Sequence, residues 1–71
     1  MASDVGAEVE RIRALLRERL KRIPPGVTNG GARQVSAYMD AAKKAAALVD
    51  AKRQPTLLAV QGALRTLESF S

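Results

Sequence analysis

The sequence of 71 residues contains no cysteine, no histidine and no tryptophan, and it has only one tyrosine and one phenylalanine. Without cysteine the chain forms neither a disulfide nor a thiolate metal site. Without histidine it lacks the commonest metal ligand and the usual base for activating a nucleophile. We therefore expect no metal, no cofactor and no catalytic residues of the nucleophile–base kind.

Long apolar runs are also missing. No window approaches the roughly 18 consecutive apolar residues of a membrane span. The first residues, Met1 to Asp4, are polar and acidic, whereas a secretory signal starts with basic residues and continues into an apolar segment. These patterns predict a cytoplasmic protein, or a virion-associated one if the source is a phage.

The few acidic residues are scattered among basic ones. Asp40 is followed one turn later by Lys43 and Lys44, and Glu18 is followed by Arg22. Such spacing is typical of solvated ion pairs on helices. We see no clustered oxygen ligands for calcium or magnesium and no apolar pocket that would shift the pKa of a carboxylate. We therefore expect no enzymatic activity and no small-molecule substrate.

A glycine-rich segment invites comparison with phosphate-binding loops. Gly31 follows Gly26 at the spacing of such a loop, but Ala32 stands where the loop requires lysine, and no strand precedes it. We interpret the segment as a turn in which Thr28 or Asn29 caps the following helix.

Two breaks divide the chain into three helical segments. Residues 24–31 combine two prolines with three glycines and Asn29, and Pro55 provides the second break. The pattern predicts helices over about residues 4–23, 32–53 and 55–69, with Pro55 at the first helical position. We expect one small all-α domain spanning 1–71. It is either a three-helix bundle or a helical hairpin plus a third helix, with short loops, alone or as an oligomer.

Each predicted helix carries apolar residues at steps of three and four. The stripes are Val5, Val9, Ile12, Leu16, Leu20 and Ile23 in the first, Val35, Tyr38, Met39, Ala42, Ala45, Ala46 and Val49 in the second, and Leu57, Val60, Leu64 and Leu67 in the third. The second arc is the widest, so this helix is expected to contact neighbours on more than one side.

Two leucines, Leu15 and Leu58, lie outside these stripes. Single exposed leucines are common on monomeric proteins. Together with the wide apolar arc, which includes Tyr38, Met39 and Leu48, they predict a surface for a partner, either a second copy or a different protein. A membrane surface is a minor alternative, because the first helix lacks tryptophan and phenylalanine on its apolar face.

Basic residues exceed acidic ones by five charges, which favours an anionic partner. Nucleic-acid binding would use Arg11, Arg17, Lys21, Arg22, Lys43 and Lys44. Three features oppose it: the arginines surround the first helix, the third helix begins with mostly apolar residues, and aromatic platforms for single strands are missing. An ordinary solvated basic surface is an equal alternative.

Two functional hypotheses follow from the sequence. The first is a small, basic, non-enzymatic interaction or assembly module, of the kind found among bacterial accessory and phage structural proteins, which binds a partner chain or itself through apolar helix faces. The alternative is a nucleic-acid-binding module that uses the basic residues of the first two helices.

Overall fold

Residues 4–70 are described by a computed structural model and form four α-helices. These are α1 (Val5–Leu20), α2 (Pro25–Thr28), α3 (Gly31–Asp50) and α4 (Leu57–Glu68). No strand occurs within this range. The all-α prediction is confirmed, but the number of helices is wrong. A single helical turn, α2, occupies the segment that we interpreted as a loop, because Pro25 has a backbone angle suited to the first position of a helix.

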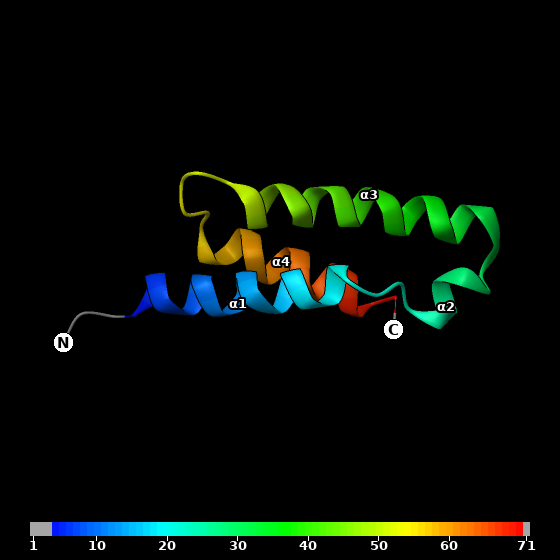
Figure 1. The fold of residues 1–71 in the computed structure, drawn as a ribbon, viewed down its shortest axis with the longest axis horizontal. Coiled ribbons are helices and arrows are strands. Elements are labelled where there is room, and N and C mark those ends of the chain that lie inside the picture. The colour runs from blue at the N-terminus through cyan, green and yellow to red at the C-terminus, as the bar shows by residue number, and fades with distance from the viewer. Residues whose placement is uncertain (1–3, 71) are drawn as a thin grey trace.

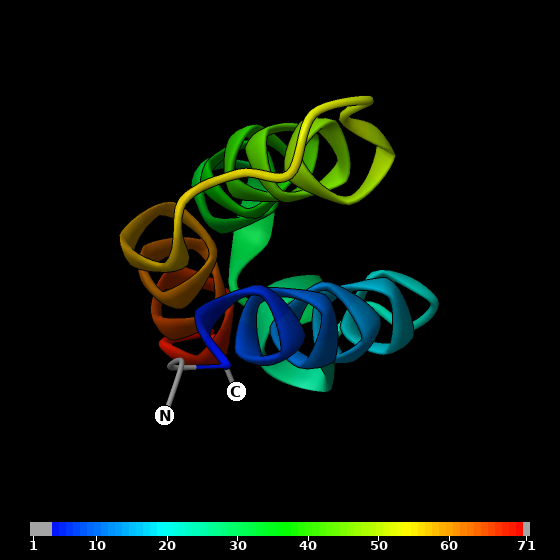
Figure 2. The ribbon, with the colours of Figure 1, turned by 90° about the vertical axis from the view of Figure 1, so that its left-hand side faces the viewer.

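The three long helices lie side by side (Figure 1). α1 and α4 run in the same direction and α3 runs in the opposite one. Viewed end-on, they stand at the corners of a triangle, and each contacts the other two (Figure 2). α3 has 20 residues, against 16 in α1 and 12 in α4, and its first turns extend beyond both neighbours. α2 packs against this extension.

The start of α3 differs from the predicted capping arrangement. The residue at the N-cap is Gly30, which offers no side chain, and Gly31 opens the helix with a positive φ of 85°. The hydroxyl of Thr28 instead donates to the carbonyl of Pro24, 3.4 Å away. The predicted cap by Thr28 or Asn29 is therefore wrong, because Thr28 belongs to α2 and Asn29 ends it.

The other helix ends are shorter than the sequence pattern suggested. α1 stops at Leu20 and leaves Ile23 outside, and α3 stops at Asp50 because Ala51 is extended. α4 begins after Thr56, whose hydroxyl oxygen accepts a hydrogen bond from the amide of Ala59 at 3.2 Å. This side-chain cap, and not Pro55, starts the helix.

The core contains part of each apolar stripe. Its buried residues are Val9, Ile12, Leu16, Val27, Tyr38, Ala45, Val49, Val60 and Leu67. Val27 adds a contribution from α2 that the sequence analysis did not include. The ends of the stripes stay exposed, namely Val5, Ile23, Val35 and Met39. The core is therefore small and lacks both ends of the first stripe and the start of the second, while Val49 and Leu67 at the ends of the second and third stripes are buried.

Candidate interaction surfaces

A wide hollow in the described part of the protein lies between the end of α1, the following loop and α4. It has a volume of about 910 Å³, and we call it the α1–α4 groove. Its apolar lining is Leu15, Ile23, Pro24, Pro25 and Leu64, and its charged lining is Glu18, Arg19, Lys21, Arg22 and Glu68. An apolar lining bordered by charges of both signs is typical of a surface that contacts another protein.

Two side chains give the groove its exposed apolar surface. Leu15 is 40% exposed, because it lies off the buried stripe of α1. Ile23 is 60% exposed, because α1 ends at Leu20 and the chain turns away before Pro24. The prolines fix the backbone angles of this turn, so the wall they form is stiff.

Two ion pairs form among the charged residues that line the groove, and one of them connects its two helices. Lys21 contacts Glu18 at 2.7 Å, and Arg19 of α1 contacts Glu68 of α4 at 3.3 Å. A smaller hollow of about 270 Å³, lined partly by Glu8 and Arg11, shares Leu64 and Glu68 with the groove. The two hollows therefore adjoin between α1 and α4, and we call them together the furrow.

A separate hollow of about 370 Å³ lies between α3 and α4. Ala37, Ala41, Ala59 and Ala63 line it together with Leu48. Because alanine side chains are small, they do not fill the space between α3 and α4 at this point, and a hollow remains. This hollow places Leu48 on a different face of the protein from the groove that contains Leu15.

The five residues predicted to bind a partner do not form one surface. Leu58 is 80% exposed on α4 but does not line the groove with Leu15. Met39 and Leu48 lie nine positions apart on α3, which places them on opposite sides of that helix. The expectation for Tyr38 is corrected, because this residue is buried.

Tyr38 instead supports the fold. Its hydroxyl donates to the carbonyl of Arg22 at 3.2 Å, and its ring meets that of Phe70 edge-on with centroids 5.4 Å apart. Sequence periodicity had placed Tyr38 on the apolar arc of α3, and the bond to Arg22 explains how its polar end is accommodated there.

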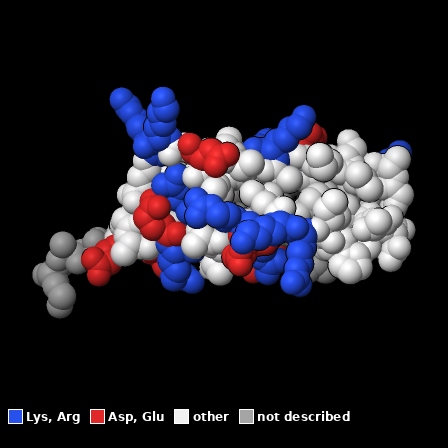
Figure 3. Space-filling view, viewed as in Figure 1, with Lys and Arg blue, Asp and Glu red and all other residues white. Residues whose placement is uncertain are grey.

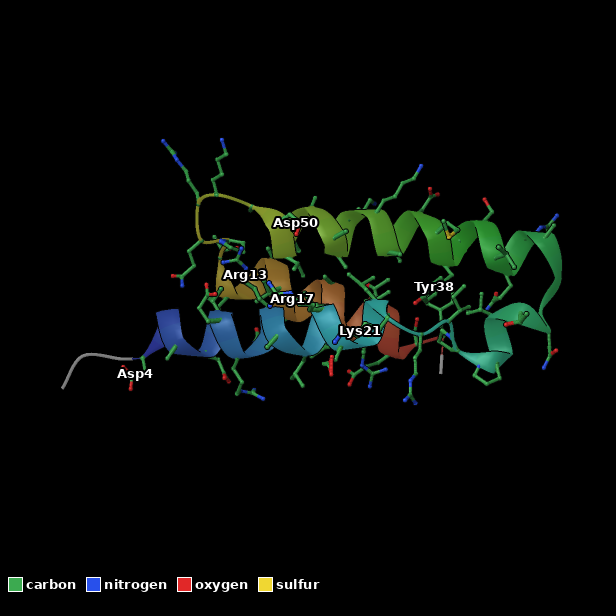
Figure 4. The ribbon with its side chains drawn as sticks, in the orientation of Figure 1. Asp4, Arg13, Arg17, Lys21, Tyr38 and Asp50 are labelled. Atoms are coloured by element: carbon green, nitrogen blue, oxygen red, sulfur yellow. The ribbon has the colours of Figure 1, made fainter. Side chains whose placement is uncertain are left out.

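The six residues proposed for nucleic-acid binding are also dispersed. Arg11 lies in the smaller hollow, Lys21 and Arg22 border the groove, and Lys44 lines the α3–α4 hollow. Arg17 extends from the side of α1 that faces α3 (Figure 4), and Lys43 is exposed on α3. No single ridge collects them.

Charge is unevenly distributed along the molecule instead. Lys and Arg side chains gather over α1 and the end of α3 near the α3–α4 loop, with Asp and Glu among them, while the end that carries α2 is almost uncharged (Figure 3). Between Ile23 and Met39 the only charged residue is Arg33. The exposed apolar residues Ile23, Val35 and Met39 belong to this charge-poor stretch.

The glutamates are engaged by neighbouring polar side chains. A hydrogen bond from Arg11 lowers the pKa of Glu8, and one from Lys21 lowers the pKa of Glu18. The pKa of Glu10 is lowered first by a hydrogen bond from Gln54 and then by one from Arg13. A general acid needs a carboxyl group whose pKa is raised, whereas the pKa values of these three glutamates are lowered.

Arg13 has a structural role that the sequence analysis missed. Its guanidinium donates to the carbonyls of Leu48, Val49 and Ala51 at 3.1, 2.7 and 2.9 Å, and its side chain is only 14% exposed. It therefore caps the C-terminus of α3, where the helix dipole favours a cation. Basic residues are common on helix surfaces, so sequence alone gave no signal for this contact.

A polar network extends from this cap to the α3–α4 loop. Glu10 pairs with Arg13 at 2.8 Å and accepts a hydrogen bond from the amide of Gln54 at 3.0 Å. The same amide donates to the carbonyl of Gly6 at 3.1 Å. The network joins α1 to the loop and removes Arg13 from the surface that an anionic partner would meet.

Neither a known protein family, nor a curated protein, nor a solved structure matches this chain. Among residues 4–70 no helix is both long enough and apolar enough to cross a bilayer. The same residues contain no group of three or more acidic side chains placed to hold a metal ion.

Proposed function

We propose that this protein is a small, basic, non-enzymatic helical module that binds another protein chain through the α1–α4 groove. Bacterial accessory proteins and phage structural proteins include modules of this type, which would act in the cytoplasm or in the virion. The observation that carries the proposal is the apolar lining of the groove, which is left exposed beside a small core.

The balance of apolar side chains supports an interaction role. Six large apolar residues are exposed, against eight buried ones other than Ala45. Fully burying a leucine or isoleucine side chain contributes about 1.5–3 kcal/mol. Leu15 and Ile23 lie in one hollow, so a single partner segment would bury both together with Leu64.

The geometry of the groove supports a helical or extended occupant. Its wall is held by two prolines and by the Arg19–Glu68 ion pair that joins α1 to α4. A surface that is already in its binding conformation loses little conformational entropy when a partner binds. The borders carry both signs of charge, which favours one orientation of a partner over others.

Site-specific photo-cross-linking tests this proposal. A photoreactive amino acid replaces Leu15 in one variant and Leu58 in the other, each is expressed in the native host, and adducts are identified by mass spectrometry. We expect a protein adduct from position 15, because this side chain lines the groove. We expect none from position 58, which is more exposed but lies outside it.

Both variants should unfold at the temperature of the wild-type chain, which serves as the control for folding. Adducts of equal yield from both positions would show that exposure alone governs cross-linking. That result, or the absence of a protein adduct at position 15, would refute the groove as a binding site.

A second candidate function is nucleic-acid binding, favoured by cations that form no salt bridge within residues 4–70. These are Arg17, Arg22, Arg33, Lys43, Lys44, Lys52, Arg53 and Arg65. Their dispersion favours contacts to phosphates over contacts to particular bases. Such binding would be independent of sequence and sensitive to salt.

This candidate predicts a steep salt dependence in the anisotropy of labelled duplex DNA. With about four cations on phosphates, affinity should fall about 100-fold between about 50 and 200 mM salt. Replacing Arg17, Lys43, Lys52 and Arg53 with glutamine should remove most of that dependence. An affinity that does not change with salt, or no binding at the lower salt concentration, would eliminate this function.

A further inference from the structure

We propose that the occupant of the α1–α4 groove is a second copy of this chain, whose α1 lies antiparallel to α1 of the first, with the two Leu15 side chains meeting at the two-fold axis. This inference rests on the proposed function and specifies its partner. It follows from the order of charges along one face of α1.

Five residues at steps of three and four define this face, which we call the α1 stripe. They are Glu8, Arg11, Leu15, Glu18 and Arg22. Residues at this spacing lie above one another on a helix surface, and Arg22 continues the line just beyond the end of α1. Glu8 is half-exposed and the other four residues are exposed. The stripe is therefore distinct from the buried stripe of Val9, Ile12 and Leu16.

The α1 stripe also lies where a partner helix would fit. Leu15, Glu18 and Arg22 line the groove, and Glu8 and Arg11 line the smaller hollow that continues it. The stripe thus borders the full length of the furrow between α1 and α4. A helix placed in the furrow would contact every member of the stripe and the apolar side chain of Leu64.

The charges reverse about Leu15. Towards the N-terminus the stripe presents Arg11 and then Glu8, and towards the C-terminus it presents Glu18 and then Arg22. In an antiparallel pair centred on Leu15, Arg11 faces Glu18 of the second copy, and Glu8 faces Arg22 of the second copy. The two-fold axis produces each pair twice, once with the arginine supplied by the first copy and once with the arginine supplied by the second copy.

Other arrangements lack this complementarity. In a parallel pair, Glu8 would face Glu8 and Arg11 would face Arg11, which is repulsive. The chain as a whole has a charge of +5, but the α1 stripe has two acidic and two basic residues and no net charge. The stripe itself therefore adds no net repulsion between two copies, although Arg19, Lys21 and Arg65 give the lining of the two hollows an excess of basic residues.

Existing contacts do not prevent this pairing. Glu8 now pairs with Arg11 and Glu18 with Lys21 within one chain, and the four side chains are 40–67% exposed. Exposed ion pairs of this kind contribute little to stability. Their carboxylates are able to accept from both copies, because each oxygen has two lone pairs.

The decisive experiment measures association by light scattering and sedimentation equilibrium with the full chain. The wild type should show a mass twice that of the 7.6 kDa chain. Glu8→Arg and Arg22→Glu should each weaken the dimer about 10-fold or more, because each places like charges opposite one another twice. Leu15→Glu should abolish the dimer, and Leu58→Glu should leave it unchanged.

Mixing the two single variants gives the sharpest result. A heterodimer of Glu8→Arg with Arg22→Glu has opposite charges at both ends, so we expect the mixture to dimerise within about 3-fold of the wild type. Arg17→Glu is the matched control, since it carries the same net charge as Arg22→Glu but lies off the stripe. It should dimerise by itself and should not rescue Glu8→Arg.

Three results would overturn the second copy as occupant. These are a wild-type mass of one chain at millimolar concentration, dimers of wild-type strength from both single variants, or a mixture that stays monomeric. A different protein cross-linked at position 15 together with a monomeric wild type would keep the proposed function and refute only this inference. No adduct at position 15 together with a dimer lacking rescue would refute both.

Discussion

Replacing Leu16 with alanine is expected to lower the free energy of unfolding by about 3–4 kcal/mol. The Leu16 side chain is fully buried, and it belongs to the core that α1, α3 and α4 share. Alanine would remove three carbon atoms and leave a cavity, because the helix backbones around it cannot collapse completely.

Such a loss is large for a chain of 71 residues. Stabilities of about 0.05–0.15 kcal/mol per residue give a total of about 4–10 kcal/mol. We therefore expect the midpoint of thermal unfolding, followed by circular dichroism, to fall by about 12–32 °C, since each kcal/mol lowers it by about 4–8 °C in a domain of this size. Leu58→Ala is the matched control, since the same truncation there removes a side chain that is 80% exposed and lies outside the groove, and it should cost less than about 1 kcal/mol. Equal losses in the two variants would contradict the burial assigned to Leu16.

Arg13→Ala is expected to have the second largest effect, a loss of about 3 kcal/mol. The change removes three charge-assisted hydrogen bonds to the carbonyls of Leu48, Val49 and Ala51. Hydrogen bonds to charged groups contribute about 1.5–3 kcal/mol each. Water replaces part of this contribution, because the cap lies at the edge of the core.

Urea unfolding of Arg13→Ala and Arg17→Ala would measure this effect. Arg17 lies one turn further along α1 and has no hydrogen bond or ion pair among residues 4–70, so its replacement should change stability by less than about 0.5 kcal/mol. Arg13→Lys should recover only part of the loss, since an ammonium group does not reach three carbonyls with the geometry of a guanidinium. If Arg13→Ala unfolds at the same urea concentration as Arg17→Ala, the capping role is wrong.

Much of the fold was predictable, because the spacing of apolar residues along each helix indicates which side of the helix is buried. The stripes of α1, α3 and α4 placed Val9, Leu16 and Val60 correctly in the core. Periodicity failed where a local interaction decided the structure. The helical turn after Pro24 depends on the fixed angle of Pro25, and the start of α4 depends on the hydroxyl of Thr56.

The candidate site was predictable only in part. Leu15 stood out because it departs from the stripe of its helix. Ile23 did not, because its exposure results from the early end of α1, and the groove it lines depends on the path of the chain through Pro24. The role of Arg13 was hidden for a different reason, since its partners lie 35 to 38 residues away in the sequence.

Charged side chains are unevenly distributed between the two ends of the molecule. The α2 end carries a single charged residue, Arg33, between positions 23 and 39, whereas the remaining charge lies along the rest of the chain. At the end opposite α2, the acidic and basic residues balance: Asp4, Glu8, Glu10 and Asp50 against Arg11, Arg13, Lys52 and Arg53. The excess of positive charge therefore lies in the rest of the chain, and the charge-poor surface with Ile23, Val35 and Met39 has little long-range field of its own to attract or repel a charged partner.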